Sequence, residues 1–130
     1  MNPDPNWISK KALMLLHEES LAAFGGARGM RDEALLDSAL ARPHNTLAYN
    51  SESTIADIAA SYAYGLAKNH PLVDGNKRMA FLSIGLFLAI NGHRLVTDPV
   101  DAIWHIQNLA GGELSELELA VWINANMQKI

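Results

Sequence analysis

The feature that most constrains this chain is an apolar run from Met79 to Ile90, MAFLSIGLFLAI. The run is shorter than the roughly 20 residues that a helix needs to cross a bilayer. Polar residues flank it, NKR before and NGHR after. A helix that is apolar on all sides is typical of the centre of a helical protein. We therefore expect a core helix over about 76–90, surrounded by the other helices of the chain.

The other apolar residues recur at helical spacing, and start and stop signals divide them into five further helices. N-cap residues, capping boxes, glycine pairs and prolines supply these signals. The expected bounds are Ser9 to Gly25, Asp32 to Pro43, Ser53 or Thr54 to about His70, Asp98 to Gly111, and Ser115 onward. The stretch PHNTLAYNSES has no helical period, so we expect a loop or flap there. Residues 1–130 thus predict a single all-α domain of about six helices, with a short flap before the third.

The composition excludes several classes of protein. The formal net charge of −4 argues against broad binding to nucleic acid. The chain has no cysteine, which excludes disulfides, thiol nucleophiles and cysteine metal sites. The N-terminal sequence MNPDPNW has neither the basic nor the apolar region of a secretory signal. We expect a cytoplasmic protein that binds neither membranes nor nucleic acid directly.

The stretch HPLVDGNKR, from His70 to Arg78, is the best candidate for a functional site. It precedes the core helix, and the first N–H groups of a helix form an anion site. Gly75 permits a tight turn there, and Asn76 is a possible cap. Lys77 and Arg78 place two positive charges at the positive end of the helix dipole, a conflict that a bound phosphate would remove.

Two residues of this stretch could do chemistry on such a phosphate. A histidine titrates near neutral pH and can take a proton from a hydroxyl, which suits His70. A carboxylate is a hard ligand for Mg²⁺ shared with phosphates, which suits Asp74. The residues alone also allow a plain turn, in which His70 is a core edge, Asp74 a cap and the cations solvated. The other histidines, His17, His44, His93 and His105, have no partner at a telling spacing, and we expect structural roles for them.

Two segments resemble a known family. HPLVDGNKR is similar to the Fic/Doc signature HxFx(D/E)(G/A)N(G/K)R. FGGARGMRD, followed by LLDSALARP from Leu35 to Pro43, looks like a second region of the Doc, or death-on-curing, branch. The two matches stand at the right separation, and chain length and helix order agree, so the resemblance covers nearly the whole chain.

The resemblance implies a compact, all-α Fic-type bundle that uses ATP and Mg²⁺. By analogy, His70 is the base for a target hydroxyl and Asp74 holds Mg²⁺. The phosphates would lie on Gly75, Asn76 and Arg78. The flap that aligns a target peptide would lie around 45–51, and the residues assigned to target binding are Asn45, Thr46, Leu47, Ala48 and Tyr49.

The chain departs from the family signature at Leu72, where the family has a phenylalanine that anchors the loop. Leucine buries less area but still fills a core position, so we expect a modest effect. Lys77 stands where AMP-transferring members have glycine, and its side chain hinders the close approach of a phosphate to the backbone. The lysine form resembles the Doc branch of protein kinases, in which ATP is thought to bind in the reverse direction. Lys77 would then be part of the catalytic set and would neutralise phosphate charge.

The resemblance also implies partners. Doc-like toxins phosphorylate a Ser or Thr of a translation factor of the elongation factor Tu type. A small antitoxin, whose C-terminal segment folds as a helix on the toxin, restrains them. The (S/T)xxxE(G/N) motif of the family's inhibitory helix is absent from this sequence, which favours inhibition by such a partner, docked between the first helices and the flap. Two alternatives stay open: a Fic-type AMP transferase, and a catalytically silent protein that only binds a partner.

Overall fold

The computed structural model describes residues 4–130. Residues 1–3 of the N-terminal sequence MNPDPNW lie outside the described residues. The prediction of an all-α fold of six helices is confirmed. The helices are α1 (Lys10–Phe24), α2 (Glu33–Tyr49), α3 (Ile55–Asn69), α4 (Asn76–Ile90), α5 (Pro99–Gly111) and α6 (Glu116–Asn126). None of them is long and apolar enough to cross a membrane.

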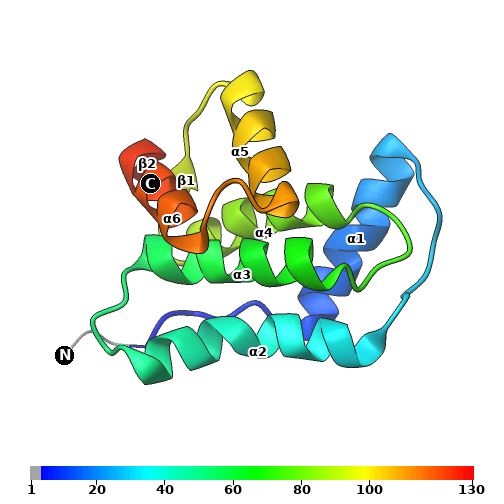
Figure 1. Cartoon of the computed structure of the whole chain (residues 1–130), viewed down its shortest axis with the longest axis horizontal. Coiled ribbons are helices and arrows are strands. Elements are labelled where there is room, and N and C mark those ends of the chain that lie inside the picture. The colour runs from blue at the N-terminus through cyan, green and yellow to red at the C-terminus, as the bar shows by residue number, and fades with distance from the viewer. Residues whose placement is uncertain (1–3) are drawn as a thin grey trace.

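Helices α3 and α4 form the centre of the molecule. In Figure 1, α2 runs along one side of α3, and α5 and α6 lie on the other side. The core contains almost all of α3 and one side of α4, including Tyr62, Leu66, Met79 and Phe87, which are essentially inaccessible to water. The apolar run therefore marks a core helix, as the sequence predicts, although Gly85 and Ile90 on its outer side are exposed.

The helices begin where the capping signals predict. The side chains of Ser9, Asp32, Thr54, Asp98 and Ser115 each accept a hydrogen bond from a backbone N–H of the first turn. Among the helices of residues 4–130, α4 alone has no side-chain cap, because Gly75 occupies its N-cap position.

The prediction that Pro43 ends the second helix is wrong. Pro43 lies inside α2, which continues to Tyr49. A proline inside a helix removes one backbone hydrogen bond, and its ring crowds the preceding turn. Contacts with α3 offset this cost: Pro43 is buried, and Thr46 Oγ1 lies 2.8 Å from Ser61 Oγ of α3. The irregular stretch before α3 is therefore shorter than predicted and covers only residues 50–54.

Two short strands were not predicted. β1 (His93–Leu95) and β2 (Met127–Lys129) pair in antiparallel fashion, with Arg94 opposite Gln128. Each strand has three residues, too few for an alternating pattern to be visible in the sequence. This strand pair connects the end of α6 to the segment that follows α4.

Candidate functional site

The stretch from His70 to Arg78 connects the two central helices. His70 ends α3 in a left-handed conformation with φ of 52° and ψ of 52°. Leu72 is 1 % exposed and forms an isolated β-bridge with Met30, and the Val73 N–H donates to the Gly29 carbonyl. Leucine therefore anchors this loop in the core, as expected for the residue that replaces phenylalanine. The connection between α1 and α2, residues 25–32, lies beside the loop.

Asn76 does not cap α4, contrary to the prediction. It is the first residue of the helix, 3 % exposed, and its side chain turns back into the loop. Its Oδ1 accepts from the Leu72 N–H at 2.9 Å, and its Nδ2 donates to the Leu72 carbonyl at 2.8 Å. These two bonds fix the orientation of the amide, so Nδ2 also donates to His70 Nδ1 at 3.2 Å. Asn76 thus links the start of the loop to its end.

The carboxylate of Asp74 is held by backbone N–H groups on both oxygens. Ala27 donates to Oδ2 at 3.1 Å and Gly75 donates to Oδ1 at 2.9 Å. These two bonds, and then the nearby charges of Arg78 and His17, lower the pKa of Asp74 below its ordinary value. The side chain is therefore an exposed, ionised carboxylate at the entrance to α4.

After Asp74, the loop continues into the uncapped N-terminus of α4, which carries the two cations Lys77 and Arg78. Gly75 has a φ of 83°, in the left-handed region that favours glycine. Lys77 is exposed. Arg78 is partly buried, and its Nη1 donates to Ser20 Oγ and to the Gly25 carbonyl, both at 3.2 Å. The guanidinium also lies over the Phe24 ring, 5.2 Å from its centroid.

This arrangement fits a nucleotide phosphate with Mg²⁺. The first-turn N–H groups and Lys77 are the donors that phosphate oxygens need. Mg²⁺ commonly binds through one or two carboxylates together with substrate phosphates, and Asp74 supplies an ionised carboxylate at the same end. Residues 4–130 contain no cluster of three or more His, Asp or Glu that would hold a metal without a phosphate.

The structure separates the predicted flap residues from this loop. Asn45, Thr46, Leu47, Ala48 and Tyr49 form the last turns of α2, so the predicted irregular conformation is wrong. The other end of α2 lies at the loop, where Pro71 accepts from the N–H groups of Arg31 and Asp32. At 1.5 Å per residue, Thr46 lies roughly 20 Å along α2 from that end. A role of residues 45–49 in target binding stays a prediction.

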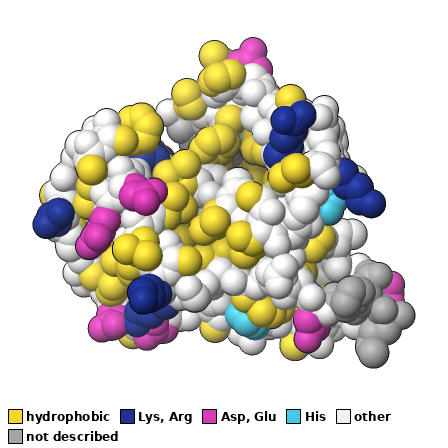
Figure 2. All heavy atoms as spheres, turned by 180° about the vertical axis from the view of Figure 1, so that it is seen from behind, with side chains coloured by type: hydrophobic (Ala, Val, Ile, Leu, Met, Phe, Trp, Pro, Cys, Tyr) yellow, Lys and Arg dark blue, Asp and Glu magenta, His cyan; other side chains and the backbone are white. Residues whose placement is uncertain are grey.

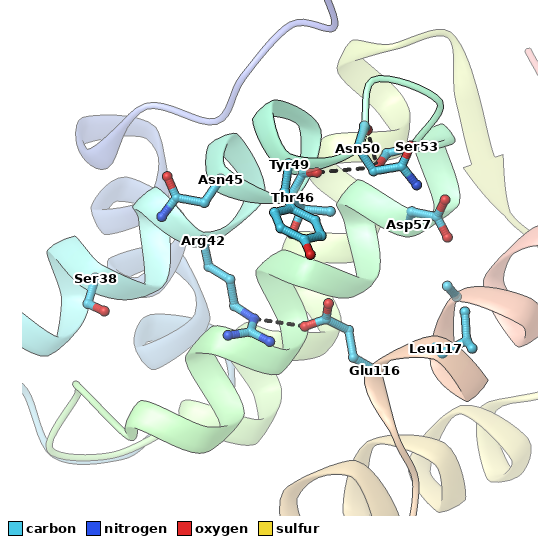
Figure 3. Close-up of a pocket in the computed structure, with 11 residues that line it drawn as sticks. Ser38, Arg42, Asn45, Thr46, Tyr49, Asn50, Ser53, Asp57, Glu116 and Leu117 are labelled. Carbon is cyan, nitrogen blue, oxygen red and sulfur yellow. Dashed lines mark hydrogen bonds and ion pairs between the residues drawn. The ribbon is translucent and has the colours of Figure 1, made fainter.

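A separate pocket lies at this far end of α2, between α2, α3 and α6. Figure 3 shows Thr46 and Tyr49 on the side of α2 that faces the pocket. Arg42 crosses it and pairs with Glu116 at 2.7 Å. The segment that lies beside the loop instead is 25–32, which contains part of the second segment that resembles the Doc branch.

An apolar groove of about 720 Å³ begins at the loop and runs between α4, β1 and α5. Its lining includes the apolar residues Phe81, Leu95 and Ile103 and the cations Lys77, Arg78 and Arg94. Figure 2 shows hydrophobic side chains gathered in a hollow on the face turned away from the viewer in Figure 1. The lining of the groove therefore combines apolar and cationic side chains.

Sequence reasoning missed two residues that hold the loop. His17 of α1 is 3 % exposed, and its Nε2 lies 3.0 Å from the Asp74 carbonyl. Arg31 donates from Nε to the His70 carbonyl at 2.6 Å and from Nη2 to the Asn69 carbonyl at 2.8 Å. Neither has a spacing signal, because both contacts join segments far apart in the sequence. The position of Arg31 within the second matching segment was the one available hint.

The chain is similar to known proteins. The chain is 47% identical over 77 residues to "Toxin Doc" of Mycolicibacterium smegmatis, covering 58% of this chain and 59% of that protein. It is 31% identical over 113 residues to "Protein kinase doc" of Escherichia phage P1, covering 87% of this chain and 89% of that protein. Residues 7–88, which contain the whole loop and the segments that hold it, match the Fic/DOC family. The chain therefore belongs to the Fic/DOC family.

Proposed function

We propose that this protein is a toxin that transfers the γ-phosphoryl group of Mg²⁺-ATP to a Ser or Thr hydroxyl of a translation factor in the cytoplasm. The observation that carries the proposal is that Lys77 lies in the uncapped first turn of α4, which follows the ionised Asp74 directly. The names of the two relatives, a Doc toxin and a protein kinase, support it. A factor of the elongation factor Tu type is the proposed target.

Each residue of the loop has a proposed role. Asp74 would hold Mg²⁺, which neutralises phosphate charge when it is bound. The N–H groups of the first turn of α4, with Gly75 and Asn76 at its start, would donate hydrogen bonds to the phosphate oxygens. Lys77 and Arg78 would add positive charge. In phosphoryl transfer, positioning and neutralisation of charge are most of what a protein contributes.

His70 would take the proton of the target hydroxyl as the hydroxyl oxygen attacks the γ-phosphorus and ADP leaves. Because Asn76 donates to Nδ1, the proton of a neutral His70 ring lies on Nε2. The ring can therefore accept a proton only when it gives up the contact with Asn76. The His70 side chain is exposed, so it is free to turn toward an arriving hydroxyl.

AMP transfer is the second candidate, and one assay separates it from the kinase reaction. The full chain is incubated with Mg²⁺, the target factor and ATP labelled at either the γ- or the α-phosphorus. The proposal predicts label on the target from γ-labelled ATP alone, and a mass increase of one phosphate. Label from α-labelled ATP alone would refute phosphoryl transfer and establish AMP transfer.

Three variants test the roles of the loop. His70→Ala and Asp74→Asn should lose transfer by at least about a hundredfold, the usual scale for a lost general base. Lys77→Ala should weaken transfer, whereas Lys129→Ala, which removes an exposed cation far along the chain on β2, should leave it unchanged. If His70→Ala arrests growth as strongly as the wild type on expression, the protein acts as a partner-binding protein and the enzyme proposal fails.

An antitoxin segment is the proposed inhibitory partner, and the groove between α4 and α5 is its proposed site. The apolar lining residues suit one face of an amphipathic helix, and the cations Lys77, Arg78 and Arg94 suit acidic residues on its edge. The groove near the end of α2, lined by Trp7, Leu47 and Ile55, is the alternative site that fits the position expected from the sequence. Its lining includes Asp4 and no Lys or Arg.

Two matched substitutions locate the partner. Ile103→Lys in the groove should prevent rescue of growth by a co-expressed antitoxin while the toxin stays active. Ile130→Lys, at an exposed apolar residue outside the groove, is the control and should not affect rescue. Full rescue of the Ile103→Lys toxin would contradict this site, and loss of rescue by Leu47→Lys would place the partner on the alternative groove.

A further inference from the structure

We propose that His17 is a positioning residue, which fixes the peptide of Asp74 so that its carboxylate faces the phosphate site. This inference rests on the proposed function, because it assigns His17 a role toward the proposed Mg²⁺ ligand. His17 lies on α1, far in sequence from the loop, and its ring is 3 % exposed. Its Nε2 lies 3.0 Å from the Asp74 carbonyl.

The direction of this hydrogen bond follows from its partner. A carbonyl oxygen only accepts, so His17 Nε2 carries the hydrogen and donates. The ring also packs directly against the turn: a Cβ at Gly75 would lie 3.7 Å from His17 Nε2. The glycine with positive φ and the buried imidazole thus fit together at the point where the chain enters α4.

The buried face of α1 shows that this contact is part of a larger arrangement. Two of its buried side chains are polar, His17 and Ser20, and residues three apart lie on the same face of a helix. Each contacts the loop: His17 donates to the carbonyl of Asp74, and Ser20 Oγ accepts from Arg78. A helix that only covered the core would bury apolar residues at these positions.

The contact controls the proposed metal ligand because the same peptide joins Asp74 to Gly75. Holding the Asp74 carbonyl fixes the plane of this peptide, and the N–H of that plane donates to Asp74 Oδ1. Ala27 restrains the other carboxylate oxygen from the opposite side. Without His17 the peptide would be free to rotate, and the carboxylate would lose its alignment with the N-terminus of α4. Misplacement of a reacting group by about 1 Å can cost a hundredfold in rate.

Two substitutions separate donation from packing. His17→Leu introduces an apolar side chain of similar bulk that has no donor, whereas His17→Gln keeps an N–H donor. Leu13→Ala is the control for general destabilisation, since Leu13 is buried on the same face one turn earlier, away from the loop. Hydrogen exchange of the Val73 and Gly75 amides reports the order of the turn without any need for catalysis. The Mg²⁺ concentration at half-maximal transfer reports the proposed ligand.

His17→Leu should speed exchange of the two amides and raise the Mg²⁺ requirement by about tenfold, the equivalent of about 1.4 kcal/mol. His17→Gln should stay within about threefold of the wild type in both measurements. Leu13→Ala should lower the melting temperature without a change in the Mg²⁺ requirement. If His17→Leu matches the wild type, or His17→Gln is as impaired as His17→Leu, the inference fails. A wild type that transfers no phosphate would overturn the proposed function, while exchange would still decide the role of His17.

Discussion

Gly65 provides the sharpest test of how α2 and α3 pack, since it is a glycine inside a buried helix. A Cβ added at Gly65 would lie 3.1 Å from the Ala39 Cα and 3.2 Å from the Ala39 carbonyl oxygen. Both atoms belong to the backbone of α2, so the clash cannot be relieved by the movement of a flexible side chain. Gly65→Ala therefore forces α2 and α3 apart. The clash lies in the part of α2 that also contains Pro43.

The expected magnitude follows from two opposing effects. Alanine in place of glycine favours a helix by about 0.8–1 kcal/mol, and overpacking a well-packed core costs about 1–3 kcal/mol. Gly65→Ala should therefore lower the free energy of unfolding by up to about 2 kcal/mol. Gly85 is the matched control, because it lies inside α4 with no atom within 4 Å of its added Cβ. Gly85→Ala should raise the free energy of unfolding by about 0.5–1 kcal/mol.

Urea denaturation of both variants measures these free energies from the midpoint at an unchanged slope. In thermal melts the two variants should move in opposite directions, by roughly 4 °C per kcal/mol for a chain of this size. If both substitutions stabilise the protein equally, α2 moves away from α3 at no cost. The close approach at Ala39 would then not constrain the fold, and the reasoning would be refuted.

Three further predictions concern buried or charged polar groups. Tyr62→Phe leaves the Ile8 N–H, which donates to the Tyr62 hydroxyl at 3.0 Å, without a partner and should cost about 1–3 kcal/mol in urea denaturation. Two backbone N–H groups lower the pKa of Asp74, so NMR should show its carboxyl titrating below the ordinary midpoint. The stability that these two hydrogen bonds contribute is present above the pKa of the unfolded chain and is lost as the pH falls through the pKa of the folded protein. Nitrogen shifts should place the proton of neutral His70 on Nε2, and Asn76→Asp, which accepts, should move it to Nδ1.

The helix starts could be predicted because each depends on a few neighbouring residues. Ser115 and Glu118 form the capping box that their spacing indicates, and Asp98 caps the helix in which Pro99 is the first residue. The end of α2 could not be predicted in the same way. Pro43 is a local stop signal, but packing of α2 against α3 overrides it. The residues near Pro43 in the sequence do not indicate this packing.

The candidate site shows the same difference between local sequence signals and contacts that join distant segments. The loop residues from His70 to Arg78 are contiguous, so a single stretch of sequence indicated them. The groups that orient them come from elsewhere: His17 and Ser20 from α1, Ala27 from the connection that follows. A lone buried histidine in a helix has no partner visible in the sequence, so the contact of His17 with the Asp74 carbonyl could not be predicted.

The conformation of His70 joins the fold to the proposed chemistry. It is the one residue other than glycine with a positive φ among residues 4–130, at 52°. A left-handed conformation costs a residue with a side chain about 1–2 kcal/mol, and it persists only where neighbours hold it. Arg31 holds the His70 carbonyl, and Asn76 holds the ring. In the proposed reaction the backbone bond to Arg31 would lie outside the reacting groups, whereas the ring contact would break before His70 accepted a proton. The strained backbone would thus stay fixed in the proposed reaction while the side chain moved.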